Sequence, residues 1–392
     1  MNGRISQPSA PVAATVGLLA LASAMGIGRF SLTPVLPLMQ HDMGLTFAQG
    51  GWLATGNYLG YLVGALICMA FAPRPPRAIR WGLICVAVLT VAMGLSRSPL
   101  LWLAFRFSAG AASAFVLVGV SAWAMPILAR CNKGQWSGFV FAGVGIGIVF
   151  AGLVGLAAGL DAWGSRWTWI VMGTVAAVLA FFLWWPLATN AVPSDAVASR
   201  TSGVPRRALV VAACYGLFGY GYIIPATFLP ALAREYIDNP AVFGWVWPVF
   251  GAAAALSTLA AARFGHRLAP WRLWAAAQWV LAAGVLAPVF SLNAVTLLTA
   301  AVCVGGTFMV ITMAGIKEVL RVAGPQASQG VGMMTAAFAV GQIAGPLTVS
   351  LLAGSSSAFR MASIIAALAL VVGNCVLSIE NEVVTRHSLT NN

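Results

Sequence analysis

Charge is scarce in this chain. Only 7% of its 392 residues are charged, about a third of the fraction usual in soluble globular proteins, and 60% are hydrophobic. Acidic residues are the rarest of the charged types, with eight against 21 Lys and Arg. So few charges exclude an ordinary soluble domain.

Cysteine and histidine are also rare, at six and three residues. Their spacing matches neither a disulfide framework nor a metal site, and the cysteines fall mostly inside apolar runs. The sequence has no nucleophile motif and no phosphate-binding loop of the Walker type. We therefore expect no metal, no cofactor, no use of ATP and no enzymatic activity.

What the chain does have is long apolar runs that recur from one end to the other. A run of about 20 apolar residues crosses the hydrocarbon core of a bilayer as a helix. The sequence therefore predicts an all-α integral membrane protein with twelve transmembrane helices. They lie near residues 12–39, 47–71, 79–96, 99–126, 136–158, 167–188, 208–232, 241–262, 273–290, 294–316, 329–353 and 359–379. The first run lacks the cleavage site of a secretory signal, and we expect it to be retained.

Lys and Arg residues predict the orientation. If the amino terminus is cytoplasmic, most loop arginines and lysines fall on the cytoplasmic side, which is the usual bias of membrane proteins. The basic residues of the outside loops are Arg97, Arg166, Arg234 and Arg360. We expect a multi-pass protein of the cell inner membrane with both termini in the cytoplasm. The net charge of +13 then reflects orientation, and we expect no nucleic-acid partner.

The chain divides into two halves. The polar stretch 189–207 is rich in Pro, Ser and Thr and predicts a cytoplasmic linker between bundles at 1–188 and 208–380, followed by a tail at 381–392. Two glycines and a proline recur 193 residues apart: Gly26, Gly28 and Pro37 return as Gly219, Gly221 and Pro230. Such a repeat points to a transporter with its site between the halves.

Several motifs resemble those of the major facilitator superfamily (MFS). These are "DMGLTFAQGGWLATGNYLGYLVGAL" (42–66), "RFSAGAASA" (106–114) and "GQIAGP" (341–346). "GIGRFSLTPVLPLM" (26–39) is similar to the first helix of the YbfB/YjiJ-type subgroup. The resemblance implies two pseudo-symmetric six-helix bundles that transport a small molecule by alternating access, and we expect a monomer in the lipid bilayer.

The cytoplasmic loops depart from the superfamily pattern. After the second run, "FAPRPPRAIR" lacks the expected Gly and Asp. Its counterpart "AARFGHRL" keeps Arg263, Gly265 and Arg267, but has Ala262 where an acid is expected. Arg263 and Arg267 are the candidate gating residues of that loop.

Two arginines, Arg29 and Arg106, lie inside apolar runs, where a charge costs about 3 kcal/mol. Two guanidinium groups facing one cavity suit a carboxylate or a phosphate, so both are candidate substrate-binding residues. Arg29 has two alternatives: capping of backbone carbonyls near Pro34 and Pro37, or snorkelling. Arg106 has one, a structural lock between the fourth and first helices.

Polar residues on the same helix faces extend the candidate substrate site. Tyr215 and Tyr222 share a face of the seventh run, and Asn57 and Tyr61 share one of the second. Gln342 of the eleventh run is the last member. Each could equally make a hydrogen bond between helices.

Glycines predict where helices approach closely and slide. The candidate conformational residues are Gly143, Gly147, Gly341, Gly345 and Pro346. No acid lies in the middle of a run, so a proton site deep in the membrane is not expected. If protons are coupled, Asp42, Glu318 or the substrate itself must carry them.

The leading hypothesis is therefore a secondary transporter of a small organic anion. The alternative is an efflux antiporter that exports neutral or hydrophobic compounds, such as drugs or sugars. A non-transporting receptor or scaffold would need neither buried arginines nor an internal repeat.

Overall fold

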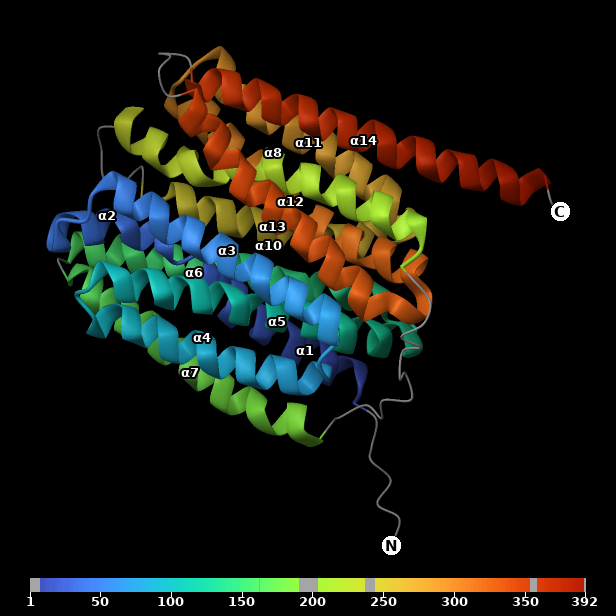
Figure 1. The fold of residues 1–392 in the computed structure, drawn as a ribbon, viewed down its shortest axis with the longest axis horizontal. Helices are drawn as coiled ribbons and strands as arrows, with labels where there is room; N and C mark the ends of the chain where they lie inside the picture. Colours follow the sequence, from blue (N-terminus) through green and yellow to red (C-terminus); the bar gives the residue numbers. More distant parts are fainter. Residues whose placement is uncertain (1–7, 162, 190–203, 237–243, 353–357, 391–392) are drawn as a thin grey trace, which may run out of the picture.

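The structure is a computed structural model that describes residues 8–161, 163–189, 204–236, 244–352 and 358–390, called the described residues below. These residues form helices joined by short turns, with no strand among them. The helices lie side by side and mostly run along the longest axis of the molecule (Figure 1).

The first half contains seven α-helices, one π-helix (η1) and one 3₁₀ turn (η2). They are α1 (Ala10–Leu21), η1 (Ala22–Arg29), α2 (Leu32–Met43), α3 (Phe47–Phe71), α4 (Pro75–Leu95), α5 (Pro99–Arg130), η2 (Gly134–Trp136), α6 (Ser137–Leu160) and α7 (Gly164–Thr189). The second half contains α8 (Arg206–Tyr236), α10 (Val246–Phe264), η3 (Gly265–Arg267), α11 (Pro270–Phe290), α12 (Ala294–Ala323), η4 (Gly324–Gln326), α13 (Ala327–Leu351) and α14 (Ala358–Thr390).

The predicted all-α membrane fold is confirmed. Eleven stretches of the described residues are long and apolar enough to cross a membrane. The longest of them, Ala294–Val349, holds α12 and α13, which are 30 and 25 residues long and meet at η4. Each of the twelve predicted runs thus corresponds to a helix of spanning length, the first run being the broken helix α1–η1–α2.

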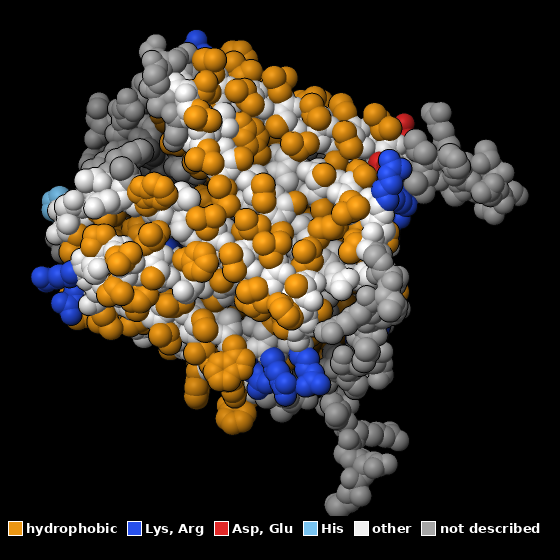
Figure 2. Space-filling model, in the orientation of Figure 1, with side chains coloured by type: hydrophobic (Ala, Val, Ile, Leu, Met, Phe, Trp, Pro, Cys, Tyr) orange, Lys and Arg blue, Asp and Glu red, His pale blue; other side chains and the backbone are white. Residues whose placement is uncertain are grey.

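The outer surface is apolar, as a lipid-facing surface must be. Large side chains such as Phe181, Phe182 and Trp185 are about two-thirds exposed, at 67%, 65% and 65%. Figure 2 shows hydrophobic side chains over most of the visible face, with Lys and Arg gathered mainly toward its ends. A surface of this kind is stable against lipid and unfavourable in water.

The helices pack as two groups. Helices α1 to α7 contact one another, as do α8 to α14, and the two most extensive contacts between the groups are those of α6 with α10 and of α3 with α13. We call these two contacts the seams. Figure 1 shows α4 and α7 on one side of the molecule and α11 and α14 on the other, with the seam helices between them.

The boundaries differ in detail from those expected. Most of the predicted linker, 189–207, lies outside the described residues, and α8 begins at Arg206. The predicted tail, 381–392, starts within α14, because this helix continues to Thr390.

Candidate functional site

A break in the first helix positions Arg29. The chain changes from α-helix to π-helix over Ala22–Arg29, then forms a turn at Phe30 and Ser31 before α2 begins. The Phe30 amide donates to the carbonyl of Met25 at 3.1 Å, five residues back. Pro34 has no amide hydrogen and cannot continue the helical hydrogen bonds across the turn. Short π-helices often mark functional sites because they release backbone groups from the regular pattern.

Arg106 binds the backbone groups released by this break. Its Nη1 donates to the carbonyl of Gly28 at 2.8 Å and its Nη2 to that of Arg29 at 2.7 Å. The side chain is only 2% exposed. This is the geometry of a structural lock between α5 and η1. Arg106 thus provides the capping of backbone carbonyls that was considered above for Arg29. Asn57 extends it, since its Nδ2 donates to the carbonyl of Arg106 at 2.9 Å.

Arg29 lies between the two helix groups. Its guanidinium carbon is 3.6 Å from the centre of the Tyr61 ring, and its Nη2 donates to Oε1 of Gln342 on α13. The side chain is 3% exposed, which excludes snorkelling toward the membrane surface. Its Nε and Nη1 have no hydrogen-bond partner in the part of the chain that the structure describes. Among the described residues, no carboxylate forms an ion pair with it.

A small aromatic pocket adjoins Arg29. It has a cavity volume of about 20 Å³, room for on the order of one water molecule. Both helix groups contribute to its lining, which consists of Met25, Arg29, Phe30, Tyr61, Leu117, Tyr215, Phe308, Met309, Thr312 and Phe338. The arginine is the single charged side chain of this lining.

The tyrosines of α8 take different places. Tyr215 lines the pocket, and its hydroxyl hydrogen-bonds the Thr312 hydroxyl at 3.0 Å. Tyr222 lies behind the lining, stacked on Phe308 at 5.2 Å and on Phe338 at 5.9 Å between ring centres, and its hydroxyl has no partner. The structure thus brings Tyr61, Tyr215 and Gln342 to Arg29 or its pocket, and places Asn57 in the lock.

The family model described as "Uncharacterised MFS-type transporter YbfB" matches residues 21–378, which include both helix groups and this pocket. The chain belongs to this family. The MFS membership that the motifs predicted is therefore confirmed.

One curated relative and one solved structure are similar to this MFS chain. The chain is 27% identical over 261 residues to the "Uncharacterized MFS-type transporter YceJ" of Bacillus subtilis (strain 168), a match that spans 62% of the chain and 64% of YceJ, less than two thirds of that relative. In fold it is similar to the crystal structure of the human organic anion transporter MFSD10 (TETRAN), with a TM-score of 0.71 and 15% identity. That match covers 95% of this chain and all of MFSD10.

Sequence reasoning missed much of the pocket lining. Phe308 and Phe338 contribute its aromatic walls, and Phe30 is 6.1 Å from Phe308 in an edge-to-face contact. In an MFS transporter rich in aromatic residues, nothing distinguishes a pocket phenylalanine from a lipid-facing one by sequence alone. Phe30 had a usable signal, because it follows Arg29 directly.

The predicted glycines lie within the bundles of this transporter. A Cβ at Gly143 or Gly147 would overlap the backbone of α1 or η1. A Cβ at Gly341 or Gly345 would overlap α8, and Pro346 lies half-buried in the same helix, α13. These glycines therefore support close packing inside each bundle.

Other glycines lie at the seam between α6 and α10. A Cβ at Gly145 would lie 2.6 Å from the carbonyl oxygen of Gly251, and one at Gly251 would lie 2.7 Å from the amide of Val149. Gly145 and Gly251 permit the backbones of the two bundles to approach closely. A seam glycine and a bundle glycine follow the same spacing rule, so the sequence alone does not separate them.

The two candidate coupling acids both have partners. Asp42 accepts from the Ser165 amide in the first turn of α7 and from His41 at 3.0 Å. It therefore acts as a cap that ties α2 to α7.

The candidate gating residues are exposed. Arg263 lies at the end of α10 and Arg267 in η3.

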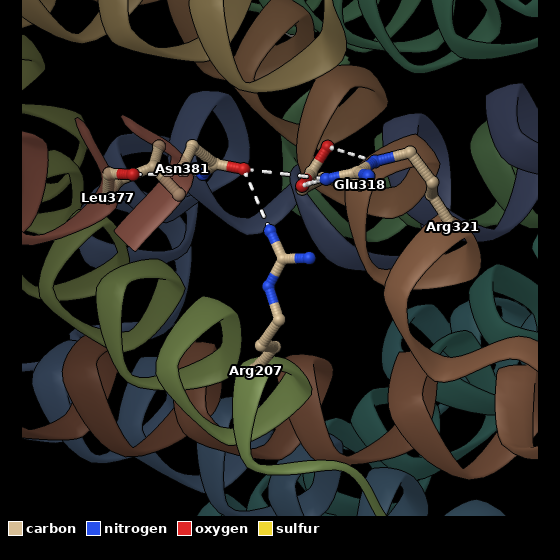
Figure 3. Close-up of polar contacts among 5 residues, drawn as sticks. All are labelled: Arg207, Glu318, Arg321, Leu377 and Asn381. Atoms are coloured by element: carbon tan, nitrogen blue, oxygen red, sulfur yellow. Dashed lines mark hydrogen bonds and ion pairs between the residues drawn. The ribbon is translucent and has the colours of Figure 1, made fainter. Parts of the chain in front are cut away.

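Glu318 belongs to a polar cluster at the end of the second bundle where α8 begins and α12 ends (Figure 3). Its side chain is fully buried and pairs with Arg321 of the same helix through two hydrogen bonds, one of 3.1 Å. Asn381 of α14 accepts from Arg321 at 3.4 Å and from Arg207 of α8 at 3.3 Å. The cluster thus connects three helices.

Replacing Glu318 with Ala is expected to lower stability by about 1–3 kcal/mol, because the buried pair and its bonds to Arg321 are lost. The cost stays moderate since the Arg321 side chain is 47% exposed and can turn to water. Thermal unfolding of the purified protein measures it. Glu382→Ala removes an exposed acid of α14 and is the matched control. Equal melting temperatures for both variants would contradict a structural role for the cluster.

Proposed function

We propose that this transporter carries a small organic anion by alternating access, with the anion held at Arg29 between the two bundles. The observation that carries the proposal is a buried guanidinium with two unpartnered nitrogens and no carboxylate paired with it among the described residues. Arginine stays protonated in proteins, so this charge persists at every physiological pH. A carboxylate or phosphate supplies both the missing counter-charge and the missing acceptors.

The position of Arg29 fits a mechanism in which the bundles move. It extends from η1 of the first bundle and bonds to Gln342 of the second, so separating the bundles exposes it to one side. A midplane site at the contact between two repeats is the usual arrangement in secondary transporters. MFSD10, described as an organic anion transporter, has the same fold; at 15% identity the proposal rests on Arg29 and not on that likeness.

The proposal also covers the ion that drives transport and the orientation of the protein in the membrane. Asp42 and Glu318 are held by their partners, and the pocket lining contains no acid or histidine. We propose uniport or anion exchange, or proton coupling through the titration of the substrate itself. The basic loops support placement in the cell inner membrane with both termini in the cytoplasm.

Export of a neutral or hydrophobic compound is the second candidate. The aromatic lining of the pocket favours it, because Phe30, Phe308 and Phe338 offer apolar contacts to any flat ligand. A cationic compound is disfavoured at a site whose lining holds one positive charge and no acid.

Ligand binding to the purified protein tests the proposal. Carboxylates, each paired with its neutral amide, are titrated while the thermal unfolding midpoint is followed. We expect carboxylates to bind and Arg29→Gln to weaken them about tenfold or more, the worth of a charge-assisted hydrogen bond. Arg97→Gln, which removes an exposed loop arginine, is the control. Amides that bind as tightly as carboxylates, with no effect of Arg29→Gln, would favour the second candidate.

A further inference from the structure

The anion site is built for a single negative charge. Arg106 directs its two terminal nitrogens to the carbonyls of Gly28 and Arg29 and is not part of the pocket lining. Arg29 is then the one cation of the pocket lining, and no histidine or lysine accompanies it. A second negative charge on the ligand would remain without a positive partner in the buried lining, which is unfavourable.

Three of the buried donors without a partner among the described residues belong to Arg29 and to Gln342, which is bonded to it. The Nε and Nη1 of Arg29 have no acceptor, and neither has Nε2 of Gln342, whose Oε1 bonds to Arg29. Gln342 is fully buried and Arg29 is 3% exposed. Buried donors without acceptors are uncommon, and one carboxylate adjoining Arg29 would supply acceptors to these donors.

The guanidinium of Arg29 also lies over an aromatic ring. Tyr61 covers its face at 3.6 Å, and the N–H groups of a guanidinium lie in the guanidinium plane. The contact with Tyr61 therefore occupies the face of the Arg29 guanidinium and leaves the N–H groups at its edge for hydrogen bonds. A side chain packed in this way loses less freedom on binding a carboxylate than a flexible one does.

Five aromatic residues, Phe30, Tyr61, Tyr215, Phe308 and Phe338, form about half of the lining. Phe30 of the first bundle is 6.1 Å from Phe308 of the second with the rings at 79°, and Tyr222 stacks behind Phe308 at 12°. Phe338 is 5.9 Å from Tyr222. Rings in such arrangements favour a further ring over a saturated group of equal size, since stacking and edge-to-face contacts add to the burial of area.

We propose that the transported anion is a monocarboxylate carried on an aromatic ring, an inference that rests on the proposed anion site. The carboxylate binds Arg29 and the Gln342 amide, and the ring lies among Phe30, Phe308 and Phe338. In the closed pocket there is room for about one water molecule, so this ligand enters when the bundles separate. Because the carboxylate contacts Arg29 of one bundle and Gln342 of the other, it links the two halves when bound.

Four small probes separate the parts of this inference. Benzoate is an aromatic monoanion, cyclohexanecarboxylate its saturated counterpart, benzamide its neutral counterpart and phthalate an aromatic dianion. Binding to the purified full-length protein is measured by calorimetry and by the shift in thermal unfolding. We expect benzoate to bind about fivefold more tightly than cyclohexanecarboxylate, and at least tenfold more tightly than benzamide or phthalate.

Two variants complete the test. Phe338→Leu keeps an apolar side chain in the pocket wall and is expected to remove most of the preference for benzoate over cyclohexanecarboxylate. Phe182→Leu, at a lipid-facing phenylalanine that is 65% exposed, is the control and should keep the preference.

The outcomes distinguish the inference from the proposed function. Equal binding of benzoate and cyclohexanecarboxylate, both lost in Arg29→Gln, would overturn the aromatic class and leave the anion site standing. Phthalate binding more tightly than benzoate would overturn the single charge. Benzamide binding as well as benzoate, with no effect of Arg29→Gln, would overturn the anion site itself. Failure of benzoate to bind at all also overturns the inference.

Discussion

Arg106→Leu is expected to destabilise this transporter far more than Arg29→Leu, although both changes remove a buried arginine from the same region. Arg106 supplies the donors for the carbonyls of Gly28 and Arg29 at the break of the first helix. Leucine leaves both oxygens buried without a donor, at about 1–3 kcal/mol each. The expected loss is therefore about 2–6 kcal/mol.

Arg29→Leu is expected to change stability little and ligand binding strongly. The wild-type side chain holds a buried charge with two unpartnered nitrogens, and replacing such a group with an apolar one is often neutral or stabilising. The variant loses its hydrogen bond to Gln342 and its stacking on Tyr61. We expect its melting temperature to stay close to that of the wild type while carboxylate binding is lost.

Thermal unfolding followed by intrinsic fluorescence, together with size-exclusion chromatography, measures both effects. Arg106→Lys covers the case in which Arg106→Leu does not fold. Lysine keeps the charge but lacks the two diverging N–H groups that reach two carbonyls, so the melting temperature of Arg106→Lys should lie between those of Arg106→Leu and the wild type. Arg97→Leu, at an exposed arginine, is the control. A melting temperature close to the wild type for Arg106→Leu, together with a strongly lowered one for Arg29→Leu, would contradict the roles assigned to the two arginines.

The membrane fold was predictable because its signals are local. Helix length, apolar runs and the spacing of Lys and Arg all follow from the bilayer, which acts on each run separately. The break of the first helix was partly predictable, since Pro34 and Pro37 lie after it. Its π-helical form over Ala22–Arg29 was not, because the break lies before the prolines and depends on packing against Gly147 and Arg106.

The roles of the two arginines depend on tertiary placement. Both are lone cations in apolar runs, and the sequence does not say which of them will reach the free carbonyls. Arg106 reaches them because α5 lies against η1, which leaves Arg29 for the pocket. A displacement of 193 residues makes Tyr222 of α8 the counterpart of Arg29. No π-helix interrupts the described α8, and Tyr222 lies behind the pocket lining, so the two counterparts have different surroundings.

Gly145 and Gly143 are expected to separate bundle motion from bundle stability. They lie two residues apart on α6, but a Cβ at Gly145 would meet α10 across the seam, whereas one at Gly143 would overlap Leu18 within the first bundle. Overpacking costs about 1–3 kcal/mol in either place. In Gly145→Ala the added Cβ destabilises the conformation in which α6 and α10 are in contact. The population of that conformation relative to the open one should drop about 5- to 150-fold. In Gly143→Ala the added Cβ destabilises the fold, so the melting temperature should drop.

Spin labels across the seam measure the population without knowledge of the substrate. Phe139 at the start of α6 and Phe264 at the end of α10 are exposed, at 48% and 73%, and can be replaced with Cys in a background without the six native cysteines. We expect longer distances between the labels in Gly145→Ala and an unchanged distribution in Gly143→Ala. Gly51→Ala, where no atom lies within 4 Å of the added Cβ, is the control for both readouts. Both labels lie at the end of the seam where α6 begins and α10 ends. An unchanged distance distribution in Gly145→Ala would contradict the proposal that the bundles separate at that end of α6 and α10.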